Sequence, residues 1–169
     1  YREKYGLSGA VISAVDLVRG IGVYAGLEII RVPGATGYLD TNYQGKAEAA
    51  LAALERLDFV YLHVESPDES SHSGSMENKI RAIEDFDSKI VGPISEGIRK
   101  FGAYRILCTP DHPTPLRIMT HTADAVPFII YGGETEVTEG VARYDEYSAR
   151  KTGLFLEDGY RLMDMMMGR

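Results

Sequence analysis

The sequence of 169 residues contains one cysteine and no tryptophan. Because Cys108 has no second cysteine to pair with, an intramolecular disulfide is excluded. A chain of this length can bury roughly 70% of its unfolded surface, so it needs no disulfide to build a core. Cys108 lies in an apolar run, which favours a packing role and a reducing, cytoplasmic compartment.

Long apolar runs and one-sign charge clusters are also absent. No stretch approaches the ~18 apolar residues of a membrane helix, and residues 1–5 lack the apolar stretch of a signal peptide. The net charge is −7 and the basic residues are scattered. We therefore expect neither a membrane nor a nucleic acid as a partner. The composition, 44% hydrophobic and 25% charged, is typical of a single soluble domain over residues 1–169.

Short apolar runs alternate with longer amphipathic ones, which predicts an α/β fold with a mostly parallel sheet flanked by helices. The predicted strands are residues 9–13, 27–32, 59–65, 104–109 and 126–131. Residues 110–125 contain three prolines and no helical period, so a crossover helix is not expected there. The last strand should therefore run antiparallel to the one before it.

Three helices are expected. Residues 76–101 repeat apolar side chains every three or four positions, so one stripe should face the sheet, and Pro93 should kink or break the helix. A second helix is predicted over residues 41–57, with Asp40 or Thr41 as its cap, and a Met-rich one over residues 157–167.

Aspartate and histidine gather after two of the predicted strands. Asp68 and His72 follow the third strand in a predicted loop, where one helical turn would place both side chains on the same side. Asp111, His112 and His121 follow the fourth strand. Carboxylate and imidazole together favour Zn²⁺ or Mn²⁺, with Mg²⁺ as a further candidate.

The predicted sheet would bring these loops to one edge. His121 would then stay near Asp68 and His72, whereas the adjacent side chains of Asp111 and His112 should diverge toward a second ion. Two cations ~4 Å apart are a common device for phosphoryl transfer. Singly, such pairs also occur as hydrogen-bonded loop residues, so a non-catalytic domain remains an alternative.

Five segments resemble the archaeal-type branch of cofactor-independent phosphoglycerate mutase, within the alkaline phosphatase superfamily. They are HVESPDESSHSG (63–74), CTPDHPTP (108–115), THTADAVPF (120–128), GLSGAVISAVD (6–16) and PGATGYLDTN (33–42). The resemblance covers nearly the whole chain. It implies a glycolytic isomerase that interconverts 2-phosphoglycerate and 3-phosphoglycerate through a phosphoserine.

The resemblance also implies roles for individual residues. Asp68, His72 and His121 would hold one Mn²⁺ or Zn²⁺ ion, and Asp111 and His112 would belong to the other. A further position, Lys4, resembles a family lysine near the phosphoryl group.

The family's nucleophilic serine, a further metal-binding aspartate and an inserted substrate domain match nothing in this sequence. None of the ten serines is expected between a strand and a helix, so no catalytic nucleophile is assigned. The chain also begins with Tyr1 rather than Met. We therefore expect the C-terminal part of a catalytic domain, inactive without the missing N-terminal half. The alternative enzyme is a related phosphotransferase or phosphatase, for example one resembling a homoserine kinase.

Overall fold

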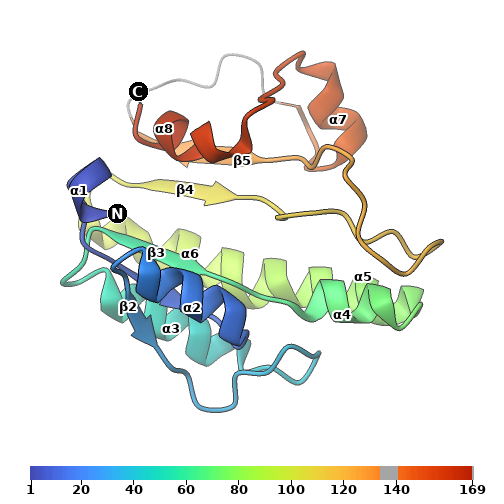
Figure 1. The fold of residues 1–169 in the computed structure, drawn as a ribbon, viewed down its shortest axis with the longest axis horizontal. Helices are drawn as coiled ribbons and strands as arrows, with labels where there is room; N and C mark the ends of the chain where they lie inside the picture. Colours follow the sequence, from blue (N-terminus) through green and yellow to red (C-terminus); the bar gives the residue numbers. More distant parts are fainter. Residues whose placement is uncertain (134–140, 169) are drawn as a thin grey trace. The chain divides into compact units, whose positions relative to one another are not determined.

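The computed structural model describes residues 1–133 and 141–168, and the chain forms two compact units (Figure 1). Unit 1 comprises Tyr1–Phe101 and Thr114–Thr120, and unit 2 comprises Gly102–Pro113 and His121–Arg169. Within the described ranges, no helix combines the length and apolar character needed to cross a membrane.

Unit 1 is built on a three-stranded parallel sheet. Its strands are β1 (Gly9–Ile12), β2 (Glu28–Ile30) and β3 (Phe59–Leu62), in the order β2-β1-β3. The central strand β1 is buried along its whole length, which suits its small and β-branched residues. Parallel pairing places the carboxyl ends of β1 and β3 at the same edge, as the sequence predicted.

Two helices precede and follow β1 along the chain. Helix α1 (Arg2–Tyr5) precedes the strand, and α2 (Asp16–Tyr24) connects it to β2. Gly22 lets α2 approach the sheet closely, because a Cβ atom there would lie 2.7 Å from the Val11 side chain. No apolar period in the sequence predicted α2.

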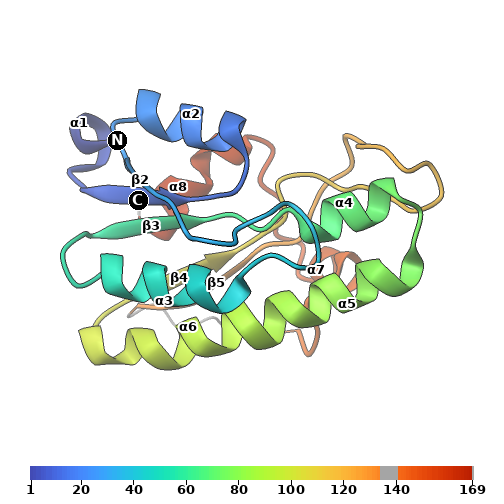
Figure 2. The same cartoon turned by 90° about the horizontal axis from the view of Figure 1, so that it is seen from below.

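Three helices of unit 1 lie on the opposite side of β3 from α2: α3 (Tyr43–Ala53), α5 (Met76–Phe86) and α6 (Gly92–Gly97) (Figure 2). Helix α4 (Ser66–His72) instead continues from the carboxyl end of β3. The core cluster of Tyr43, Ala47 and Ile90 joins α3 to the segment between α5 and α6. The cap of α3 is Asn42, whose side chain accepts the Gly45 N–H at 2.9 Å, so the prediction of Asp40 or Thr41 was wrong.

The long helix is interrupted next to Pro93, as predicted. A π-helical turn, Asp87–Val91, lies just before the proline, where the Lys89 carbonyl lacks the proline N–H, and α6 follows it. The expectation that the whole apolar stripe faces the sheet was wrong, since Met76 and Ile80 in its first half are more than half exposed. The physical reason is that α5 packs against α4 rather than against the sheet.

Unit 2 contains an antiparallel pair, β4 (Arg105–Cys108) and β5 (Ile129–Gly132), which confirms the predicted direction of the last strand. Its helices are α7 (Glu146–Lys151) and α8 (Leu162–Met166). The Arg105 guanidinium donates to the Met166 carbonyl at 2.7 Å and ties α8 to β4. The predicted helix over residues 157–167 is a 3₁₀ turn, Gly159–Arg161, followed by α8.

Candidate metal site

Helix α4 follows β3 at the carboxyl edge of the sheet. Sequence reasoning predicted a loop here because a residue before proline disfavours helical geometry. The prediction was wrong: Ser66 is the first residue of α4, and Pro67 lies in the first turn, where a missing N–H breaks no helical hydrogen bond. The Ser66 hydroxyl is fully buried and lies 2.6 Å from the Tyr43 hydroxyl, which anchors the start of α4 to α3.

Asp68 and His72 face each other one turn apart on α4, as their spacing predicted. The distance between His72 Nε2 and Asp68 Oδ2 is 3.3 Å, and both side chains are partly exposed. His72 Nδ1 lies 2.9 Å from the Met119 carbonyl oxygen. Because a carbonyl can only accept, Nδ1 is the donor.

This geometry fits a cation. With hydrogen on Nδ1, Nε2 of His72 lies 3.3 Å from a carboxylate oxygen of Asp68, close enough for one cation to contact both atoms. A histidine that ligates a metal commonly donates its other ring N–H to a backbone carbonyl, as His72 does to Met119.

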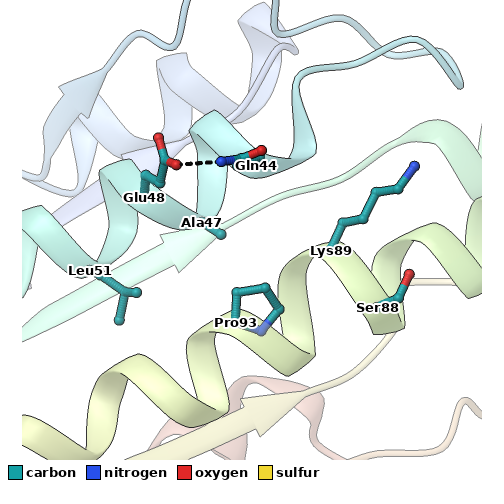
Figure 3. Close-up of a pocket in the computed structure, with 7 residues that line it drawn as sticks. All are labelled: Gln44, Ala47, Glu48, Leu51, Ser88, Lys89 and Pro93. Atoms are coloured by element: carbon teal, nitrogen blue, oxygen red, sulfur yellow. Dashed lines mark hydrogen bonds between the residues drawn. The ribbon is translucent and has the colours of Figure 1, made fainter.

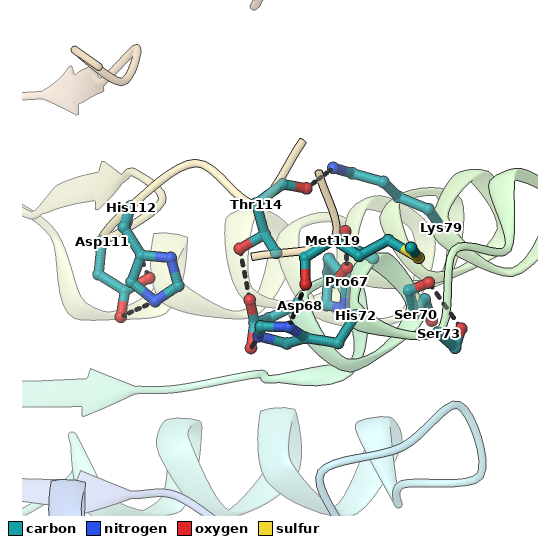
Figure 4. A network of polar contacts seen from close by, with 11 residues as sticks. Pro67, Asp68, Ser70, His72, Ser73, Lys79, Asp111, His112, Thr114 and Met119 are labelled. Atoms are coloured by element: carbon teal, nitrogen blue, oxygen red, sulfur yellow. Dashed lines mark hydrogen bonds and ion pairs between the residues drawn. The ribbon is translucent and has the colours of Figure 1, made fainter. Parts of the chain in front are cut away.

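Asp68 has a second contact on its other oxygen. The Thr114 hydroxyl donates to Asp68 Oδ1 at 2.5 Å, and the Thr114 carbonyl accepts from Lys79 Nζ at 2.8 Å (Figure 4). Lys79 of α5 therefore holds the segment whose hydroxyl contacts Asp68.

Two glutamates that the sequence analysis did not single out lie close to Asp68. Glu65, Asp68 and Glu69 each offer a carboxylate oxygen within 4.8 Å of the others. Their spacing of three and four residues is the signal that could have found them. The buried Lys46 donates to the His63 carbonyl at 3.4 Å; burial lowers its pKa to about 8, while the nearby Glu65 opposes that shift.

His72 also borders a depression of about 480 Å³ in unit 1, with lining residues Tyr38, Leu39, Glu69, Ser70, His72, Ser73 and Asn78. A second depression, of about 340 Å³, lies between α3 and the segment 88–93 (Figure 3). Its polar residues include Gln44 and Glu48, joined by a 2.7 Å hydrogen bond, but no histidine, cysteine or aspartate. The depression beside His72 is therefore the better candidate for a metal or substrate site, because its lining includes a histidine.

The remaining predicted ligands lie together in unit 2. The His112 N–H donates to Asp111 Oδ1 at 3.1 Å, and His112 Nε2 lies 3.6 Å from Asp111 Oδ2 (Figure 4). The expectation that these neighbouring side chains diverge was therefore wrong, because the imidazole folds back over its neighbour's carboxylate. The rings of His112 and His121 lie with centroids 3.7 Å apart.

Lys4 is not brought to Asp68 and His72. It lies on α1, which enters the sheet at the amino end of β1, whereas α4 follows the carboxyl end of β3 (Figures 1 and 2). Its ammonium group lies 4.8 Å from the centre of the Tyr5 ring. A contact between Lys4 and a phosphoryl group stays a prediction.

One serine does lie between a strand and a helix, contrary to expectation. Ser13 connects β1 to α2, and its Oγ is 3.1 Å from His63 Nδ1. It is only 3% exposed and accepts the Val15 N–H at 3.0 Å. The buried Ser13 hydroxyl therefore joins the start of α2 to His63 of the neighbouring chain segment.

Comparison with known proteins identifies the family. Residues 1–168 match the protein-family model described as "Metalloenzyme superfamily". The chain belongs to the metalloenzyme superfamily. The predicted α/β class, mostly parallel with one antiparallel pair, and the resemblance to cofactor-independent phosphoglycerate mutases are both confirmed.

Similar proteins from other organisms are named as phosphoglycerate mutases. The chain is 66% identical over 169 residues to the "Probable 2,3-bisphosphoglycerate-independent phosphoglycerate mutase" of Geobacter sulfurreducens. It is 52% identical over 168 residues to the 2,3-bisphosphoglycerate-independent phosphoglycerate mutase of Methanosarcina acetivorans. These matches cover 100% and 99% of the chain, which spans 42% of the length of each relative.

Two solved structures share the fold. A Pyrococcus horikoshii protein matches 99% of the chain with a TM-score of 0.90 and 32% identity, over 50% of its own length. The cofactor-independent phosphoglycerate mutase of Thermoplasma acidophilum also matches 99% of the chain, with a TM-score of 0.69 and 23% identity, over 38% of its length. The second likeness is one of fold alone.

Proposed function

We propose that this chain supplies metal ligands to a cofactor-independent phosphoglycerate mutase, which interconverts 2-phosphoglycerate and 3-phosphoglycerate. The observation that carries the proposal is the orientation of His72, whose Nδ1 is held by the Met119 carbonyl while Nε2 faces Asp68 at 3.3 Å. The names of the relatives support the choice of reaction. The single cysteine and the reaction itself favour a cytoplasmic, glycolytic setting.

We assign Asp68, His72 and His121 to one divalent ion, and Asp111 and His112 to a second. The donor set of carboxylate oxygen and imidazole nitrogen suits Mn²⁺ or Zn²⁺. When bound, such ions stabilise negative charge on the attacking and leaving oxygens of a phosphoryl transfer.

The protein's own residues determine where these donors point. Asp68 and His72 share one face of α4, so a rigid helical turn sets their separation before any ion binds. The depression beside His72 leaves room for a phosphorylated small molecule next to the ligands. We infer that the acceptor serine of the reaction is none of the ten serines in this sequence.

The test uses the complete product of the gene that encodes this sequence. The protein is loaded with Mn²⁺ or Zn²⁺ and assayed with 3-phosphoglycerate, without added 2,3-bisphosphoglycerate. Homoserine with ATP and a simple phosphomonoester are assayed in parallel. Conversion of 3-phosphoglycerate that is lost on chelation and in the His72→Ala and His121→Ala variants is expected. Turnover of only homoserine or only the phosphomonoester would contradict the mutase assignment. Absence of metal binding would contradict the whole proposal.

A further inference from the structure

The segment Thr114–Met119 contacts both candidate ligands of α4. The Thr114 hydroxyl donates to Asp68 Oδ1 from 46 residues away, and the Met119 carbonyl accepts from His72 Nδ1 across 47 residues. The other atoms of the same two groups, Asp68 Oδ2 and His72 Nε2, face each other. The segment therefore contacts each side chain through the atom that does not face the other side chain (Figure 4).

The segment is constrained at its Met119 end. The Pro115 carbonyl accepts the N–H groups of Ile118 and Met119 at 3.1 and 2.9 Å, which closes a turn. Met119 has φ 51°, a left-handed conformation that no other non-glycine residue in the described ranges adopts. Such a conformation costs about 1 kcal/mol or more. This conformation occurs at the residue whose carbonyl accepts the imidazole N–H of His72.

The segment is also fastened to the neighbouring helices. Thr114 is 6% exposed, and its carbonyl accepts from Lys79 of α5 at 2.8 Å. Gly74, between α4 and α5, has φ +72°, and a Cβ atom there would lie 2.8 Å from Met119 Sδ. Glycine at this position therefore lets Met119 lie close to the end of α4.

We propose that Thr114, the Met119 backbone and Lys79 form a clamp that positions Asp68 and His72 for metal binding. The clamp rests on the proposed metal-binding function and adds positioning residues to it. The Thr114 hydroxyl directs one carboxylate oxygen, so the other faces the imidazole. The Met119 carbonyl keeps the hydrogen of His72 on Nδ1, so Nε2 is the coordinating atom. Loss of such supporting contacts typically weakens metal binding about 10- to 100-fold.

The experiment measures Mn²⁺ affinity by titration calorimetry and by the electron paramagnetic resonance signal of free Mn²⁺. The complete gene product is compared with its Thr114→Val, Thr114→Ser and Lys79→Met variants. We expect Thr114→Val to weaken binding about 10- to 100-fold and Thr114→Ser, which keeps the hydroxyl, to restore affinity to within about 3-fold of the original. Lys79→Met should weaken binding about 3- to 10-fold, because it loosens the segment without touching a ligand.

A nitrogen-15 spectrum of the metal-free protein tests the Met119 contact directly, without a substitution. Hydrogen on Nδ1 of His72 is expected, and hydrogen on Nε2 alone would overturn that part of the clamp. Equal Mn²⁺ affinity in the original protein and Thr114→Val would overturn the Thr114 part. If Thr114→Val does not fold, unchanged affinity in Lys79→Met has the same consequence. Failure of the unsubstituted protein to bind Mn²⁺ would instead overturn the proposed function, and the clamp with it.

Discussion

The imidazole of His72 faces the carboxylate of Asp68 across 3.3 Å, one turn along α4. Each group also forms a hydrogen bond with the segment Thr114–Met119, through the atom that does not face the other group. Their approach therefore does not depend on flexible surface side chains. Prior orientation matters because a metal ion then binds without ordering its ligands first.

Replacement of His72 by alanine should lower Mn²⁺ or Zn²⁺ affinity by about 100-fold or more, because a ligand is removed outright. Asp68→Asn should have a comparable effect, and the double variant should lose less than the sum of the two. Titration calorimetry measures all three. The matched control is His63→Gln, which changes a histidine in contact with the buried Ser13 and should keep its metal affinity. Full affinity in His72→Ala would contradict the assignment.

Two glycines on α2 should respond in opposite directions to alanine. At Gly20 a Cβ atom would meet nothing within 4 Å, so Gly20→Ala should raise the free energy of unfolding by about 0.5–1 kcal/mol through helix propensity. At Gly22 the Cβ atom would lie 2.7 Å from Val11 and 3.0 Å from Ile29, so Gly22→Ala should lower it by about 1–3 kcal/mol. Urea denaturation measures both values. Equal effects of the two changes would show that α2 does not pack closely on β1 and β2.

Sequence patterns predicted the positions of the strands better than those of the helices. All five strands form where apolar runs were bounded by turn residues, and the proline-rich segment correctly indicated the antiparallel β5. Helix α2 was missed because Gly20 and Gly22 lower its intrinsic propensity. The role of Gly22, close approach to the sheet, depends on tertiary contacts that no local pattern shows.

The candidate site was predicted only in part, for a related reason. The four-residue spacing of Asp68 and His72 is a local signal, and the structure confirms their approach. Thr114 and Met119 lie more than 40 residues away along the chain, and only the folded chain brings them to α4. The exposure of Met76 and Ile80 has the same origin, since periodicity identifies an apolar stripe but not the surface it contacts.

Burial of Lys46 should make stability depend on pH. Its pKa is about 8 in the folded protein and 10.5 in its ordinary state, so the folded form binds fewer protons between these values. The free energy of unfolding should therefore rise from pH 8 to pH 9.5. Lys46→Met should remove this rise and increase the free energy of unfolding at pH 7 by on the order of 1–3 kcal/mol. This gain is smaller than removal of the buried charge alone would give, because the hydrogen bond to the His63 carbonyl is lost.

Urea denaturation at several pH values measures the effect, with the exposed Lys151→Met as the control that should keep the rise. The range stops at pH 9.5 because burial raises the pKa of Tyr1 to about 12, and that shift acts in the opposite direction at higher pH. Identical pH profiles for the original chain and Lys46→Met would contradict the account of Lys46.

The buried hydrogen bond between Tyr43 and Ser66 should couple α3 to the start of α4. Their hydroxyl oxygens are 2.6 Å apart, and either can donate. Tyr43→Phe and Ser66→Ala should each lower the free energy of unfolding by about 1–3 kcal/mol, because each leaves a buried hydroxyl without its partner. The double variant should lose about 1 kcal/mol less than the sum. Strict additivity in this double-mutant cycle would show that the contact contributes nothing to stability.

The most direct test of the metal-ligand assignment is anomalous diffraction from crystals of the complete gene product soaked in zinc chloride. We predict an anomalous peak about 2.0–2.2 Å from both His72 Nε2 and a carboxylate oxygen of Asp68. Zinc peaks found only at other residues, or none at saturating zinc, would contradict the central claim that these two side chains are metal ligands.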